Sequence, residues 1–188
     1  MKRFLIVVFA SLFAFYGCKC SNNAPAETAN QQQEDTPMAA IERYMTEVGG
    51  QYSPGTYCIP YAQVVATDES NPEDIRVWGI FQVENYNLEG DTLLCVSGGS
   101  HPGLMHVAKT ADGYEVKSFD EVADGSLFDS TAKAIFLEHY DTFIKTQSND
   151  TARKAVREKA IATYVSAHQI PAKLYKDYGW DAVTIPQN

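Results

Sequence analysis

Residues 75–118 read IRVWGIFQVENYNLEGDTLLCVSGGSHPGLMHVAKTADGYEVKS, in which apolar runs alternate with turn-forming residues. Turn signals at 88–91 and at Ala111-Asp112-Gly113 predict two hairpins. Because the connections are short, the strands are expected to pair as an antiparallel meander. Strands are predicted over 75–86, 93–97, 104–109 and 114–118.

The run 75–86 indicates which way its side chains face. Val77, Phe81 and Val83 fall on one side of the predicted strand and are expected to be buried. On the other side, Gln82 and Glu84 are expected to point to water.

Residues 98–103, Gly-Gly-Ser-His-Pro-Gly, are predicted to form a bulge or a wide loop between two strands. Ser100 and His101 invite a catalytic interpretation. However, a nucleophile elbow needs G-x-S-x-G at a strand-to-helix turn, and this segment has neither that pattern nor a following helix. No catalytic role is therefore assigned to Ser100 or His101.

The segments before this stretch predict a helix and a further strand. Thr36-Pro37 is a typical helix start, and Gly49-Gly50 is a typical end. Between them, Ile41, Met45 and Val48 form an apolar stripe at helical spacing. A strand follows over 57–67, and Pro60 places its start at an edge or a bulge.

The segments after residue 118 read as helices. An apolar side running from Ala132 to Ile144 predicts a second helix, and Ser148-Asn149-Asp150 breaks it. A third helix follows and ends at Ile170-Pro171. Residues 172–178 could add one or two helical turns. The tail 180–188 shows no clear pattern.

Strands followed by helices indicate an α+β domain. The expected fold is a curved antiparallel meander of four to five strands, packed by an N-terminal helix and two to three C-terminal helices. Residues 37–188 lack a second linker and an internal repeat, so they are expected to form a single domain.

The first residues predict where in the cell the protein is located. Met-Lys-Arg is followed by the apolar run 4–16 and by Gly17-Cys18. The run is shorter than the roughly 20 residues of a membrane-spanning helix and fits a signal-peptide core. The segment resembles the signal peptide of bacterial lipoproteins. This resemblance implies a signal peptide over 1–17 and a lipid on Cys18. The alternative is an unmodified Cys18 near an ordinary cleavage site.

Residues 18–36 are rich in Asn, Gln, Ala and Glu, and are predicted to be a disordered tether. No acidic residue directly follows Cys18, which favours an anchor that faces the periplasm. Removal of Lys2 and Arg3 with the signal peptide changes the formal net charge from −9 to −11. This acidity argues against nucleic acid as a partner and leaves membrane attachment to the lipid.

The other cysteines are Cys20 in the tether, and Cys58 and Cys95 in predicted strands. The bacterial envelope permits disulfides, so Cys58 and Cys95 could form a bond across the sheet. They could equally be small buried residues without a bond.

Several short segments carry a family resemblance, namely Trp78-Gly79-Ile80-Phe81, Tyr86 before Gly90-Asp91, Val96–Ser100, Lys109–Tyr114 and Asp124-Gly125-Ser126. A helix on a curved meander resembles the cystatin-like and nuclear-transport-factor-like superfolds, and the stretch 77–126 resembles small extracytoplasmic domains of bacteria. Those domains occur as lipoproteins or appended to membrane sensor proteins. The resemblance implies a fold and carries no catalytic residue across, because such superfolds host many functions.

The remaining polar residues yield no metal or cofactor motif. The histidines lack ligand spacing, and the segment 120–125 fails the pattern of a calcium loop. The third helix concentrates positive charge, for which a solvated face is favoured over an anion or partner contact. The four histidines are His101, His106, His139 and His168, and the basic residues are Arg153, Lys154, Arg157 and Lys159.

Aromatic residues gather on or near the first two strands and either fill the core, which we favour, or line an apolar pocket. They are Tyr52, Tyr57, Tyr61, Trp78, Phe81 and Tyr86.

The expected function is therefore that of a non-catalytic, lipid-anchored periplasmic binding or accessory protein. Its expected partner is an envelope protein or a small apolar ligand. The alternative is a small pocket enzyme of the nuclear-transport-factor-like type, such as an isomerase or hydratase. That enzyme would need a buried Asp, Glu or His with a raised pKa.

Overall fold

The computed structural model describes residues 35–187. The predicted signal peptide, Cys18, Cys20 and the predicted tether up to residue 34 lie outside the described residues. None of the described helices is both long and apolar enough to cross a membrane. The elements are α1 (Pro37–Gly49), β1 (Tyr57–Asp68), β2 (Ile75–Glu89), β3 (Thr92–Thr110), β4 (Gly113–Glu121), η1 (Gly125–Leu127), α2 (Phe128–Phe136), η2 (Leu137–His139), α3 (Tyr140–Gln147), α4 (Asp150–Ala167), β5 (Leu174–Lys176) and β6 (Val183–Thr184).

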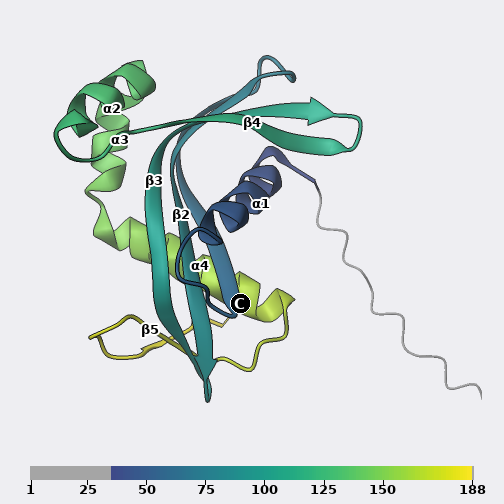
Figure 1. The fold of residues 1–188 in the computed structure, drawn as a ribbon, viewed down its shortest axis with the longest axis vertical. Helices are drawn as coiled ribbons and strands as arrows, with labels where there is room; N and C mark the ends of the chain where they lie inside the picture. Colours follow the sequence, from purple (N-terminus) through teal and green to yellow (C-terminus); the bar gives the residue numbers. More distant parts are fainter. Residues whose placement is uncertain (1–34, 188) are drawn as a thin grey trace, which may run out of the picture. The chain divides into compact units, whose positions relative to one another are not determined.

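The predicted α+β fold is confirmed. The sheet has the order β1-β2-β3-β5-β6, and β4 also pairs with β3. Strands β1 to β4 are antiparallel to their neighbours, whereas β5 runs parallel to β3. Figure 1 shows the long β3 crossing the molecule, with α1 and α4 on opposite sides of the sheet.

The first helix begins and ends where the sequence predicts. The Thr36 hydroxyl accepts a hydrogen bond from the Ala39 N–H at 3.1 Å, which caps the helix, and Pro37 occupies its first turn. Ile41 and Met45 are buried against Phe81 and Val83 of β2. This cluster forms the core on one face of the sheet.

The opposite face of the sheet carries two separate apolar clusters. One joins Trp78 and Ile80 to Phe136 and Phe143 in α2 and α3. The other joins β-strand residues to α4 and β5, and includes Tyr86, Ile161 and Tyr175. Gln82 and Glu84 occupy the same face of β2, because residues two apart in a strand point the same way.

The predicted bulge or loop at 98–103 is wrong, because β3 runs through it without a break. Glycines occupy this segment because backbone atoms of the neighbouring strands lie too close to leave room for a side chain. A Cβ on Gly98 would lie 2.6 Å from the Val83 carbonyl oxygen, and one on Gly103 would lie 2.3 Å from the Asp120 carbonyl oxygen. The irregularity of β3 lies earlier, at Val96, where the register with β2 shifts.

The predicted second helix is divided into α2 and α3. The Trp78 indole N–H donates to the Ile135 carbonyl at 3.0 Å. In a continuous helix, that carbonyl would accept from the residue four positions later. Leu137, with a φ of 48°, marks the break between the two helices.

The expectation of helical turns over 172–178 is also wrong. Lys173 and Leu174 both donate their N–H groups to the Asp91 carbonyl, at 2.8 and 3.1 Å. These bonds start β5, which pairs with 92–94 of β3 and buries Tyr175. A contact with a residue so distant in the chain has no local sequence signal.

Cys58 and Cys95 are free thiols, so the structure contains no disulfide between them. Cys58 lies on β1 and its thiol faces the Thr46 carbonyl of α1. Cys95 lies on β3, pairs with Tyr86 and belongs to the cluster beneath α4. The two thiols therefore lie on opposite faces of the sheet, with β2 between their strands.

Candidate functional site

A broad groove lies on the α4 side of the sheet. Its walls are the middle of β3, the first half of α4, and the C-terminal segment from Tyr175 to Val183. Tyr61, Gln82 and Glu84 form its floor, and its volume is about 1070 Å³. We call this hollow the β3 groove. It is the candidate functional site.

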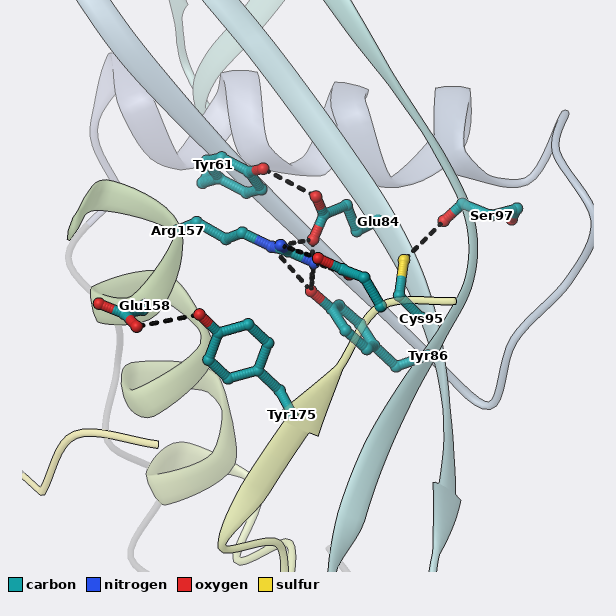
Figure 2. A network of polar contacts seen from close by, with 9 residues as sticks. Tyr61, Glu84, Tyr86, Cys95, Ser97, Arg157, Glu158 and Tyr175 are labelled. Atoms are coloured by element: carbon teal, nitrogen blue, oxygen red, sulfur yellow. Dashed lines mark hydrogen bonds and ion pairs between the residues drawn. The ribbon is translucent and has the colours of Figure 1, made fainter. Parts of the chain in front are cut away.

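Arg157 of α4 lies at the centre of a polar network in the groove (Figure 2). Its Nε donates to Glu84 Oε2 at 2.6 Å, and its Nη1 donates to Asp177 Oδ2 at 2.7 Å. Nη2 donates to the Tyr86 hydroxyl at 3.0 Å. Only 15% of the Arg157 side chain is exposed. The network therefore joins α4, β2 and the segment after β5 in one set of contacts.

Two further tyrosines complete the network. The Tyr61 hydroxyl donates to Glu84 Oε1 at 2.9 Å, and the Tyr175 hydroxyl donates to Glu158 Oε1 at 2.9 Å. The Arg157 guanidinium also lies over the Tyr175 ring, 5.1 Å from its centroid. Arg157 thus has partners on several sides.

These contacts hold the titratable groups in fixed protonation states at neutral pH. The hydrogen bond from Arg157 lowers the pKa of Asp177. Burial, followed by the nearby Glu84 charge, raises the pKa of Tyr86 and Tyr61 well above the usual range. Burial and the Glu84 charge also raise the pKa of Cys95 to about 11. The tyrosines therefore stay neutral donors, and Cys95 stays an unreactive thiol.

Gln82 places a buried polar atom without a partner in the floor of the groove. Its residue is only 5% exposed, and its side-chain oxygen is buried without a hydrogen bond. The expectation that Gln82 points to water is therefore wrong, because α4 and the C-terminal segment enclose this part of the face. A buried amide without a partner is costly, and a bound ligand could satisfy it.

Exposed aromatic residues stand at the rim of the groove. Tyr178 is 93% exposed and Trp180 is 75% exposed, and both line the groove. Val96, at the bulge of β3, adds a further exposed apolar side chain. Tyr and Trp offer large contact area together with a hydrogen-bonding group, which is why they are enriched at interfaces.

The basic residues of the third predicted helix have two different roles. Arg157 is enclosed in the network, so the solvated-face interpretation is wrong for that residue. Arg153 and Lys154 line the groove and pair with Asp150 and Glu158. The cations of this helix face thus have acidic partners within the chain.

The structure does not bring the histidines together. His101 contacts Glu121 at 2.6 Å and the Tyr52 hydroxyl at 2.8 Å, whereas His106 contacts Asp74 at 2.7 Å. The rings of His139 and His168 pack on Trp78 and Tyr164. Within residues 35–187, no three His, Cys, Asp or Glu side chains are grouped as metal ligands.

Ser100 and His101 cannot form a nucleophile and base pair. Ser100 lines the β3 groove, while His101 contacts Tyr52 on the α1 side of the sheet. Consecutive residues of a strand point to opposite faces.

The aromatic residues singled out from the sequence lie partly in the core and partly in the groove. Trp78, Phe81 and Tyr86 are buried in the core, as favoured, while Tyr61 also reaches the floor of the groove. From the sequence, Gln82 and Glu84 are expected only to point to water, and no site role is predicted for the rim residues Tyr178 and Trp180. The apolar Trp78 and Ile80 on the face of Gln82 are the signal that this face is covered.

Comparisons of the chain with protein-family models, with curated proteins and with solved structures gave no match.

Proposed function

We propose that this chain is a lipid-anchored binding protein of the bacterial envelope, facing the periplasm, whose β3 groove holds another envelope protein without catalysis. Gly17-Cys18 after a short apolar run supports the anchor. The unpartnered Gln82 inside an open groove rimmed by Tyr178 and Trp180 is the observation that carries the binding role.

A protein partner fits the groove better than a small apolar ligand does. Pockets for small ligands enclose their ligand in mostly apolar walls. Here the floor and walls contain the ion-paired Glu84, Arg157 and Asp177, and the rim aromatics are open to solvent. Aromatic side chains around a polar centre are typical of protein interfaces.

The alternative of a pocket enzyme has weaker support. General acid–base catalysis at neutral pH needs a carboxyl or imidazole whose pKa is moved toward 7. Arg157 instead lowers the pKa of Asp177, and it also holds Glu84 through an ion pair. Burial raises the pKa of the Glu42 carboxyl, but that residue lies on α1, outside the groove.

In vivo photo-crosslinking tests the binding role. The full chain would carry a photoreactive phenylalanine analogue in place of Tyr178, or in place of the exposed Leu127 of η1 as a matched control. We expect a discrete protein adduct from the Tyr178 position and none from Leu127. The same pattern from both positions, or no adduct from Tyr178, would contradict a protein partner in the groove.

The anchor needs a separate test. Labelled palmitate should enter the full chain and be lost in Cys18→Ser, which should move to the soluble envelope fraction. A Cys18→Ser protein that stays in the membrane fraction would show that Cys18 is not the attachment point.

A further inference from the structure

The middle of β3 has an unpaired edge. Along one side β3 pairs with β2 over nearly its whole length. Along the other side β5 pairs with 92–94 and β4 pairs with 103–110. No strand within residues 35–187 pairs with the part between them, Cys95–His101, on that side. We call this part the open edge.

Backbone groups of the open edge point outward. The Pro102 carbonyl accepts from the Val122 N–H at 2.9 Å, so Pro102 turns its backbone away from β2. Antiparallel pairing alternates between the two sides of a strand. Gly98 and Ser100 therefore present their N–H and C=O groups to the open edge, as Pro102 does to Val122.

The open edge lacks the usual protection against pairing. Natural edges are blunted by charged side chains, by proline or by a covering segment. Cys95–His101 contains no Lys, Arg, Asp, Glu or Pro, and Val96, Gly98 and Ser100 are exposed. The bulge at Val96 is its one protective feature.

The position of the open edge leaves room for an added strand. A strand placed about 4.8 Å from β3 would continue the sheet between β5 and β4. Gly98 bears no side chain, so a large side chain of the added strand can cover its backbone. Tyr178, Trp180 and Gln82 lie in the same groove and can contact alternate side chains of that strand.

Charge indicates the composition of the added segment. The groove cations Arg153, Lys154 and Arg157 all have acidic partners within the chain. An acidic residue at the centre of the added segment would therefore find no free cation among these three. The fitting occupant has no acidic residue at its centre and carries large apolar or aromatic side chains at alternate positions.

We propose that the β3 groove recognises its protein partner by strand addition: an extended segment of the partner, without acidic residues at its centre, pairs with the open edge Cys95–His101. This inference rests on the proposed function and specifies how its partner is bound. Backbone hydrogen bonds supply affinity in this mode, and the side-chain contacts supply selectivity.

A phage-displayed library of linear peptides provides the probe. Selection against the full lipidated chain in detergent micelles should yield peptides with apolar residues at alternate positions. Ser100→Pro removes an outward N–H and should weaken their binding at least tenfold. Ala62→Pro is the matched control, because Ala62 shares its strand side with Pro60 on the other edge of the sheet, outside the groove. Its binding should stay within twofold, and thermal melts should show that both variants fold.

Further measurements separate the outcomes. Hydrogen exchange over 95–101 should slow when a selected peptide binds. A Ser100→Ala variant that loses as much binding as Ser100→Pro would assign the contact to the hydroxyl and overturn strand addition. Selected peptides that bind Ser100→Pro normally would overturn strand addition too, while groove crosslinking from Tyr178 would keep the proposed function. A dimer that Ser100→Pro abolishes would assign the open edge to a second copy and overturn the heterologous partner. Absence of both peptide binding and Tyr178 crosslinks would overturn both proposals.

Discussion

Arg157 of α4 donates hydrogen bonds to both carboxylate oxygens of Asp177, and so fastens the segment after β5 to the helix. A bidentate pair between Arg and a carboxylate fixes orientation as well as position. The rim residue Tyr178 follows Asp177 directly in the chain, and Trp180 comes two residues later. This ion pair therefore places the rim of the β3 groove.

Arg157→Ala should destabilise the domain strongly. The substitution leaves the Glu84 and Asp177 carboxylates without their cation, and breaking such a pair costs about 3–5 kcal/mol. The free energy of unfolding in urea measures the loss. Lys133→Ala removes a solvent-exposed ion pair on α2, so its free energy of unfolding should stay close to that of the parent. Equal effects of the two variants would show that the Arg157 network is not a structural centre.

The Asp177 ion pair should also make stability depend on pH. Its pKa is lowered in the folded state by Arg157, so its contribution is present above the unfolded pKa of about 3.9. The contribution is lost as the pH falls through the lower folded pKa. Urea midpoints of the parent and of Asp177→Asn should differ most near pH 7 and converge toward pH 2. A difference that stays constant over this range would contradict the ion pair.

Gly98→Ala should destabilise the sheet by about 1–3 kcal/mol, the usual cost of overpacking. Its Cβ would lie 2.6 Å from the Val83 carbonyl oxygen, so β2 and β3 would have to move apart. Ser100→Ala, on the same strand, should change stability by less than about 0.5 kcal/mol. Chemical unfolding of the two variants gives the comparison. A Gly98→Ala protein as stable as the parent would mean that β3 can move without cost.

The same glycine shows why some elements can be predicted from the sequence and others cannot. α1 was predictable because Thr36, Pro37 and Gly49-Gly50 signal its ends locally. Gly98 is a turn signal in isolation, and only the approach of Val83 from another strand makes it a strand residue. β5 likewise depends on the distant Asp91 carbonyl. Gln82 looked solvated because the helix covering it lies far along the chain.

Cys58 and Cys95 should both react as free thiols once the chain is unfolded in the absence of reductant. In the folded chain, burial raises the pKa of Cys95 to about 11, so little thiolate forms at neutral pH. Its alkylation by iodoacetamide should be slow at pH 7.5 and should accelerate steadily toward pH 11. Mass spectrometry of the alkylated peptides measures both the reaction of the two thiols after unfolding and the pH dependence of Cys95 alkylation in the folded chain. A mass two units low that links the two peptides would contradict the opposite placement of the thiols.

Gln82→Leu should separate binding from stability. The Gln82 oxygen is buried without a partner, so an apolar side chain of similar size should raise the free energy of unfolding by about 1 kcal/mol. If the Gln82 amide forms a hydrogen bond with the bound partner, the same variant should weaken crosslinking from position 178. Functional sites often keep such costly groups at the expense of stability.

Gln63→Leu is the matched control for this prediction. Gln63 also has a buried side-chain oxygen without a partner, yet it does not line the β3 groove. Its substitution should raise stability by a similar amount and leave the Tyr178 crosslinks unchanged. Should both variants stabilise the chain and neither affect crosslinking, Gln82 has no part in binding. A loss of crosslinking confined to Gln82→Leu would assign the unpartnered amide to the ligand, because burial and chemistry are the same at the two positions.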